Sequence, residues 1–286
     1  MLYLFLSIIC ATALVMLFRV FEKWKIESTH AIVFNYIFCV ITGLFFVDDF
    51  SVFKQIPTWN GFPLMICLGF AFILIFLLVG KTAITSGVVT ASIAMKLSFV
   101  IPVVIAIFLY NDSITLLKIT GVLCAIVSVY LIAYEKENVQ TSKNKAVIIY
   151  PFLIFIGSGL CDAGFNYIQK RLLPVGWDHP VTVGVFASAM TLGWCLNFYK
   201  KELYQWKNVF AGIILGIPNY FSLYFLLKTL STLKWQSSVI FPINNLGIVC
   251  LSAFIGFVLF KEKFNQRKLI GFILAVTSIV IIGFLN

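Results

Sequence analysis

One lysine of this sequence lies deep inside an apolar stretch, where a charge is unfavourable. Lys96 stands about ten residues into a long apolar run, within Ser92-Ile-Ala-Met-Lys-Leu-Ser98. At roughly 1.5 Å of rise per residue, it would lie about 15 Å along a helix, near the middle of a bilayer. Charged groups at that depth cost from about 2.5 to above 10 kcal/mol and usually line a pathway. Lys96 therefore predicts a site for a carboxylate or phosphate, hence an anionic or zwitterionic solute.

An acidic residue occupies a comparable depth in a later apolar run. Asp162 lies in Gly157-Ser-Gly-Leu-Cys-Asp-Ala-Gly-Phe-Asn166, and Asn166, four residues on, shares its helix face. Three roles stay open for Asp162: proton coupling, a structural ion pair with Lys96, or packing alone.

Prolines and amides mark a further group of candidates. Pro242 precedes Asn244 and Asn245, and we expect a helix break there and at Pro102, because proline donates no backbone hydrogen bond. Such breaks persist in lipid only where protein or a wet cavity satisfies the freed groups. The amides would then hydrogen-bond a substrate or, alternatively, a neighbouring helix. The candidate substrate-binding residues, all inside apolar runs, are Lys96, Asn166, Trp194, Asn219, Asn244 and Asn245.

Enzymatic and metal chemistry find little support in the sequence. The chain has 7 cysteines, all within apolar stretches and without a C-x-x-C pair, and only 2 histidines, His30 and His179. No H-E-x-x-H or G-x-S-x-G motif occurs. We expect no catalytic residues, metal site or cofactor, and the chain is not predicted to be an enzyme.

The composition is that of an all-α integral membrane protein. Of 286 residues, 61% are hydrophobic and 11% charged, far from the balance of a soluble domain. The net charge of +10 comes from residues in the loops between apolar runs, so nucleic-acid binding is not expected. Ten runs are long enough to span a bilayer. They cover residues 2–20, 29–47, 62–81, 86–110, 115–134, 146–169, 179–199, 208–229, 236–260 and 266–285.

The pattern of spans occurs twice in the sequence, as an internal repeat of about 150 residues. Gly121, Ala125 and Ser128 recur as Gly271, Ala275 and Ser278, each 150 residues later. We interpret these small-residue stripes as helix-packing faces. Five spans per half is an odd number, so the halves must enter the membrane from opposite sides. The sequence thus predicts two inverted five-helix repeats, residues 1–134 and 146–286, joined by a polar linker at 135–145.

An acidic residue closes the fourth and the ninth span, in Phe108-Leu-Tyr-Asn-Asp112 through Gly121 and in Val258-Leu-Phe-Lys-Glu262 through Gly271. With this pattern and ten spans, the chain resembles the drug/metabolite transporter superfamily, specifically its EamA-like branch. Asp112 replaces the usual glutamate of that family. The resemblance implies a transporter whose two repeats enclose the substrate site.

The leading functional hypothesis is therefore a secondary transporter that moves a small organic solute by alternating access of the two repeats, with protons as a conceivable coupling ion. An integral-membrane enzyme and a non-transporting assembly partner are the alternatives. The expected surroundings are the bilayer of a bacterial cytoplasmic (inner) membrane, with the chain as monomer or homodimer.

The orientation of the termini stays open. Counting Lys and Arg in alternate loops gives 14 on the side opposite the N-terminus and 6 on the N-terminal side. The positive-inside rule would then place both termini outside. The family resemblance implies cytoplasmic termini.

Overall fold

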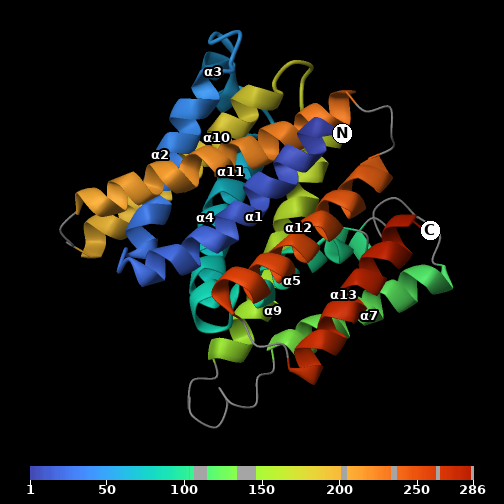
Figure 1. Cartoon of the computed structure of the whole chain (residues 1–286). Helices are drawn as coiled ribbons and strands as arrows, with labels where there is room; N and C mark the ends of the chain where they lie inside the picture. The colour runs from blue at the N-terminus through green and yellow to red at the C-terminus, as the bar shows by residue number, and fades with distance from the viewer. Residues whose placement is uncertain are drawn as a thin grey trace. The chain divides into compact units, whose positions relative to one another are not determined.

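The computed structural model describes residues 1–102, 104–105, 115–133, 146–200, 205–232, 237–261 and 265–284. Within these ranges the chain forms helices and turns and no strands (Figure 1). The predicted all-α class is thereby confirmed. The predicted linker at 135–145 and the acidic residues Asp112 and Glu262 lie outside the described residues.

The helices of the first half follow the expected spans except in the fourth, 86–110, where α5 ends at Leu97 and a turn at Ser98 and Phe99 follows. They are α1 (Leu2–Lys23), α2 (Ser28–Leu44), the short α3 (Val52–Gln55) and η1 (Ile56–Thr58), α4 (Phe62–Thr85), α5 (Val88–Leu97) and α7 (Leu116–Ala133). Those of the second half are α9 (Ala146–Tyr167), the π-helical η2 (Ile168–Leu172), α10 (Asp178–Lys200), α11 (Trp206–Thr232), α12 (Ser237–Phe260) and α13 (Gln266–Phe284).

The chain divides into two compact units, and each draws on both halves of the sequence. Unit 1 comprises Met1–Arg19, Leu78–Leu160 and Phe221–Asn286. Unit 2 comprises Val20–Leu77 and Cys161–Tyr220. Helices 150 residues apart in the sequence therefore fall in the same unit, as α7 and α13 do in unit 1 and α2 and α10 in unit 2.

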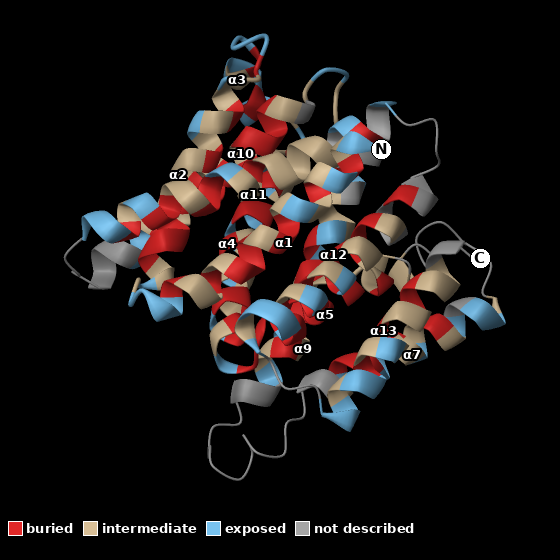
Figure 2. Cartoon of the chain, viewed as in Figure 1, coloured by how far each residue is buried: buried red, intermediate tan, exposed pale blue. Residues whose placement is uncertain are grey.

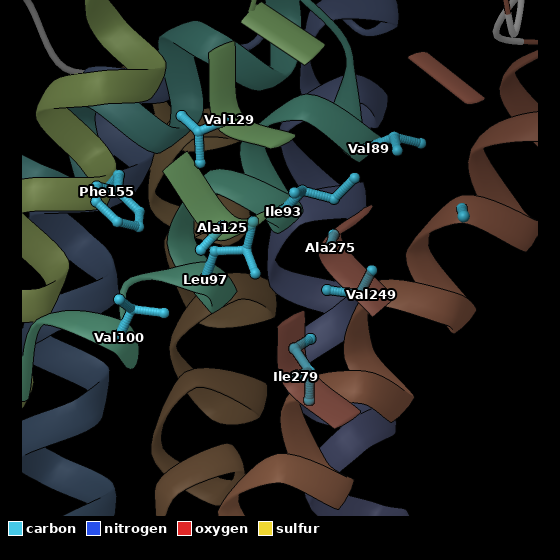
Figure 3. Close-up of a cluster of buried hydrophobic side chains, with 11 residues drawn as sticks. Val89, Ile93, Leu97, Val100, Ala125, Val129, Phe155, Val249, Ala275 and Ile279 are labelled. Carbon is cyan, nitrogen blue, oxygen red and sulfur yellow. The ribbon is translucent and has the colours of Figure 1, made fainter. Parts of the chain in front are cut away.

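The core of unit 1 is aliphatic. Ile93 and Leu97 of α5 are fully buried and meet Ala125 of α7, as Figure 3 shows. Val249 of α12 and Ile279 of α13 complete the cluster from the second half. Small side chains at the crossing of α7 and α13 let these helices approach closely, which brings their backbones within reach of side-chain hydrogen bonds.

The core of unit 2 is richer in aromatic rings. Tyr36 of α2, almost fully buried, packs against Phe76 of α4 and Phe186 of α10, each with a ring-centroid separation of 6.1 Å. The ring centroids of Trp59 and Trp177 lie 6.1 Å apart. Trp59 Nε1 also donates a hydrogen bond to the carbonyl of Leu172 at 2.8 Å. These contacts hold the connection between α3 and α4 against η2.

Large apolar side chains remain exposed along the described helices. On α7 alone they include Leu116, Leu123, Ile126 and Tyr130, and α13 carries an equivalent face (Figure 2). Five helices are long and apolar enough to cross a membrane, judged by length and composition within the described residues. Exposed apolar faces of this extent suit lipid contact rather than water. The chain is an integral membrane protein.

Proline acts differently at the two expected breaks. Helix α5 ends at Leu97, and a turn at Ser98 and Phe99 precedes Pro102. Because Pro102 offers no N–H, the Ser98 carbonyl accepts instead from the N–H of Ile101 at 2.9 Å. The break expected at Pro242 is wrong, since α12 runs through it from Ser237. Loss of one hydrogen bond near a helix start is tolerated without ending the helix.

Candidate functional site

Helices α7 and α13 meet through two hydrogen bonds that mirror each other. Ser128 Oγ donates to the carbonyl of Gly271 at 2.6 Å, and Ser278 Oγ donates to the carbonyl of Gly121 at 2.8 Å. Both serines are fully buried. Ser278 lies 150 residues after Ser128 and Gly121 lies 150 residues before Gly271, so the second bond repeats the first with the roles of the two helices exchanged. The pairing also requires that the helices run antiparallel, because Gly121 lies beside Ser278 while Ser128 lies beside Gly271.

Helices α2 and α10 of unit 2 repeat this arrangement with van der Waals contacts. A Cβ atom added to Gly43 would lie 2.7 Å from Val183 Cγ2, and one added to Gly193 would lie 3.3 Å from Val33 Cγ2. Val33 and Val183, like the two glycines, are 150 residues apart. This pair of helices is therefore antiparallel as well, with a mirrored contact at each end.

The third repeat-related pair, α5 and α12, positions the predicted lysine. The helices pack together, and Ser92 Oγ donates to Ser252 Oγ at 2.9 Å within the buried interior of unit 1. Lys96 follows Ser92 by four residues and so shares its face of α5. Its side chain is half-buried. A mirrored serine contact is impossible here, since the positions 150 residues from Ser252 and Ser92 are Pro102 and Pro242.

The amides of α12 lie inside unit 1. Asn244 and Asn245 are buried, at 3% and 9% exposure. Oδ1 of Asn244 has no hydrogen-bond partner among the described residues. A buried amide oxygen left in this way is unfavourable by about 1–3 kcal/mol. It is therefore available to a donor that a bound solute brings.

A second buried amide group, in unit 2, joins Asn219 of α11 to Asn35 of α2, which the sequence offers with Tyr36 as a candidate wall residue. Asn219 Nδ2 donates to Asn35 Oδ1 at 3.1 Å, and the thiol of Cys39 lies 3.7 Å from the same oxygen. Asn35 is fully buried, and its Nδ2 has no hydrogen-bond partner within the described residues. Asn219 directly follows Pro218 of α11.

Two glycines of α11 make this contact possible. A Cβ atom added to Gly212 would lie 3.1 Å from the backbone nitrogen of Asn35, and one added to Gly216 would lie 2.8 Å from the backbone carbonyl oxygen of Asn35. Their spacing, Gly-x-x-x-Gly, is a sequence signal that another helix approaches α11 closely, although it does not identify Asn35 as the residue contacted.

The remaining candidates are distributed as follows. Trp194 is half-buried and meets Phe34 edge-on, with ring centroids 6.0 Å apart, so its visible role is packing within unit 2. Asp162 is exposed on α9. The side chain of Asn166 lies outside the described residues. Lys96 belongs to unit 1 and Asp162 to unit 2.

Within the described part of the chain, no group of three His, Cys, Asp or Glu residues could hold a metal ion. The cysteines that the structure describes are unpaired with one another. The polar groups described so far in the two units are hydroxyls, amides, the Cys39 thiol and Lys96, which can hydrogen-bond a solute.

Comparison with known proteins yields relatives but no family. The chain matches no protein-family model. An uncharacterized protein of Haemophilus influenzae is 24% identical over 288 residues, which cover 99% of this chain and 98% of the relative. A protein of known crystal structure has a TM-score of 0.61 to this chain at 13% identity, covering 99% of this chain and 97% of the other. That likeness shows a shared fold alone.

Proposed function

We propose that this protein is a secondary transporter that moves a small organic solute across a membrane by alternating access. The mirrored contacts carry the proposal: Ser128 with Gly271 and Ser278 with Gly121 in one unit, and Gly43 with Val183 and Gly193 with Val33 in the other. In each set the second contact joins the positions that lie 150 residues from those of the first, and the two helices run antiparallel.

These contacts support an inverted-repeat architecture of ten spans. If two antiparallel helices exchange by a two-fold rotation, the axis lies perpendicular to both. For helices that cross a bilayer, such an axis lies in the membrane plane, which is the symmetry of inverted-repeat transporters. That architecture fits the drug/metabolite transporter resemblance and its EamA-like branch. Transporters of this kind bind substrate near the bilayer midplane, at the interface of the repeats.

The proposed site includes Lys96, Asn244 and Asn245, which come from the repeat-related helices α5 and α12. We extend the antiparallel arrangement of the other two pairs to these helices. Lys96 then lies about 6 Å, and Asn245 about 10 Å, along the helices from the contact of Ser92 with Ser252, on the same side of it. An ammonium group beside two amides would bind the carboxylate or phosphate of an anionic or zwitterionic solute.

The alternatives make different demands on the molecule. An integral-membrane enzyme needs acid, base or nucleophile groups within hydrogen-bond reach of each other, and the pair of this kind formed by Glu27 and His30 in unit 2 is not among the residues of the proposed solute site. An assembly partner without transport needs no buried amide atom without a hydrogen-bond partner, whereas Asn35 Nδ2 and Asn244 Oδ1 have none among the described residues. We place the transporter in a bacterial cytoplasmic membrane, with protons as the candidate coupling ion.

The test is a thermal-shift screen of purified protein against small carboxylates, phosphates and amino acids, followed by counterflow in liposomes for each stabilising compound. A ligand of the folded state raises the unfolding temperature. Lys96→Met should abolish binding and counterflow of the anionic compound. Lys54→Met, which removes an exposed lysine of α3, is the matched control and should transport normally. Unchanged counterflow in a folded Lys96→Met variant would refute the assignment of Lys96.

A further inference from the structure

The dipeptide Trp-Lys occurs at two places in unit 2 that the fold brings together. Trp24-Lys25 ends α1 and begins the turn to α2, and Trp206-Lys207 opens α11. Both indole rings face outward, with Trp24 63% and Trp206 87% exposed, and both lysines are exposed. We call these four residues the Trp–Lys pair.

Two hydrogen bonds fix the segments that carry the two dipeptides against each other. Lys207 Nζ donates to the carbonyl of Lys25 at 3.0 Å. The next residue of α11, Asn208, accepts from the N–H of Glu27 at 3.3 Å and lies 3.2 Å from His30 Nδ1 through its Nδ2. Asn208 and His30 are both buried at 2% exposure. The Trp–Lys pair is thus a built surface and not a chance meeting of two flexible loops.

Lys25 occupies a backbone conformation that disfavours it. Its φ is 53°, in the left-handed region, where it ends α1 with hydrogen bonds from the Ile26 N–H to Phe21 and from its own N–H to Glu22. Glycine is the usual residue at this position of a helix end, because a Cβ atom is strained there. A favourable interaction of a lysine with the C-terminal helix dipole offsets part of that strain.

Lys207 is disfavoured for a different reason. It is the second residue of α11, and a cation near a helix N-terminus is repelled by the partial positive charge of the unpaired N–H groups. The helix dipole therefore explains a lysine at position 25 and opposes one at position 207. The hydrogen bond from Lys207 Nζ to the Lys25 carbonyl offsets part of this repulsion, and an external anion held by the two lysines would offset more of it.

The charges around the pair leave room for such an anion. Lys23 adds a third exposed cation, and among the described residues the acids close to the pair in sequence are Glu22 and Glu27. Glu27 is engaged with the protein, since its Oε2 lies 3.1 Å from His30 Nδ1. Tryptophan side chains prefer the headgroup level of a bilayer, and lysines beside it attract anionic lipids. Two indoles with two ammonium groups match a lipid headgroup better than a soluble ion.

We propose that the Trp–Lys pair binds the phosphate of an anionic phospholipid, with Lys25 and Lys207 contacting the headgroup and Trp24 and Trp206 lying at its junction with the acyl chains. The site is distinct from the proposed solute site and does not depend on transport. It requires only that the chain sits in a bilayer with this end of unit 2 at the headgroup level.

The test compares full-length protein in nanodiscs of phosphatidylcholine alone with nanodiscs that also contain phosphatidylglycerol. We expect phosphatidylglycerol to raise the unfolding temperature of the unmodified protein, and added salt to reduce that rise. The double variant Lys25→Gly with Lys207→Gln should lose more than half of the rise. In phosphatidylcholine alone it should unfold at the same or a higher temperature, because glycine relieves the strain at position 25.

Controls separate the lipid from its alternatives. Lys54→Gln with Lys228→Gln removes two other exposed lysines and should keep the full rise. Inorganic phosphate added to phosphatidylcholine nanodiscs should give no rise. A double variant that keeps the full rise, or a phosphate effect equal to that of the lipid, would overturn the proposal. If the double variant does not fold, the double variant Trp24→Ala with Trp206→Ala replaces it. Native mass spectrometry then measures whether this variant retains less bound phosphatidylglycerol than the unmodified protein.

Discussion

Ser128 and Gly271 are joined by a buried hydrogen bond of 2.6 Å from the serine hydroxyl to the glycine carbonyl. Because Gly271 lacks a side chain, α7 approaches close enough for Ser128 to reach the backbone of α13. The same contact recurs between Ser278 and Gly121. A duplicated sequence thus becomes a duplicated contact, which an unrelated pair of apolar helices would have no reason to form.

The mirrored bonds predict mirrored effects of mutation. Ser128→Ala and Ser278→Ala should each lower the free energy of unfolding by about 0.5–1.5 kcal/mol, and by similar amounts, since each removes one buried hydrogen bond. Equilibrium unfolding in mixed micelles measures the loss. Thr277→Ala is the matched control, because its hydroxyl bonds within its own helix to Ile273 on the exposed side, and it should be close to neutral. A neutral Ser128→Ala would contradict the importance of this contact.

The glycine contacts of unit 2 predict a clash with a specific remedy. Gly43→Ala should destabilise the protein by about 1–3 kcal/mol, because the new methyl group would meet Val183 at 2.7 Å and Tyr220 at 2.9 Å. Adding Val183→Ala should restore part of the stability by making room on α10. The thermal unfolding midpoints of the two single variants and the double variant form the cycle. Strictly additive losses would show that the two positions do not meet.

The sequence predicted the packing faces but not their partners. The stripes at Gly121 and Gly271 follow from small residues spaced along one helix face, so their role in packing is confirmed. Which backbone carbonyl each serine reaches depends on where and at what angle the two helices cross. The spacing of residues along one helix does not determine that crossing. The break at Pro242 failed for a related reason, since a proline's effect depends on its distance from the helix start.

The buried amides illustrate the same limit. Asn244 was found because it stands beside another amide and a proline. Asn35 stands alone in α2, and only Gly212 and Gly216, more than 170 residues away in the sequence, reveal that a helix presses against it. Its hydrogen bond to Asn219 joins α2 to α11 and could be recognised only when the two helices were placed side by side.

The pair of Asn35 and Asn219 predicts a double-mutant cycle with a large coupling. Asn219→Leu should destabilise by about 1–3 kcal/mol, because it leaves the Asn35 oxygen buried without its amide donor. Asn35→Leu combined with Asn219→Leu should cost less than the sum of the single changes, since the two amides that bond each other are then removed together. Thermal unfolding of the four proteins measures the coupling. A coupling of zero would mean that the amides do not interact.

Asn244 predicts opposite effects on stability and on transport. Its Oδ1 is buried without a hydrogen-bond partner among the described residues, so Asn244→Leu removes an unfavourable group from the interior of unit 1. We expect the free energy of unfolding to stay the same or rise by about 1 kcal/mol. Counterflow of a solute identified by the thermal-shift screen should nevertheless fall at least tenfold, because the transporter loses a hydrogen-bond acceptor at its site.

Ser252→Ala, which breaks the nearby contact with Ser92, is the control: it should lower stability and leave the affinity for the solute nearly unchanged. If Asn244→Leu is destabilised and transports normally, the amide is a structural contact of α12. Retained stability together with lost counterflow would assign Asn244 to the solute site, since only a functional requirement then explains why a buried, unpaired amide occupies this position.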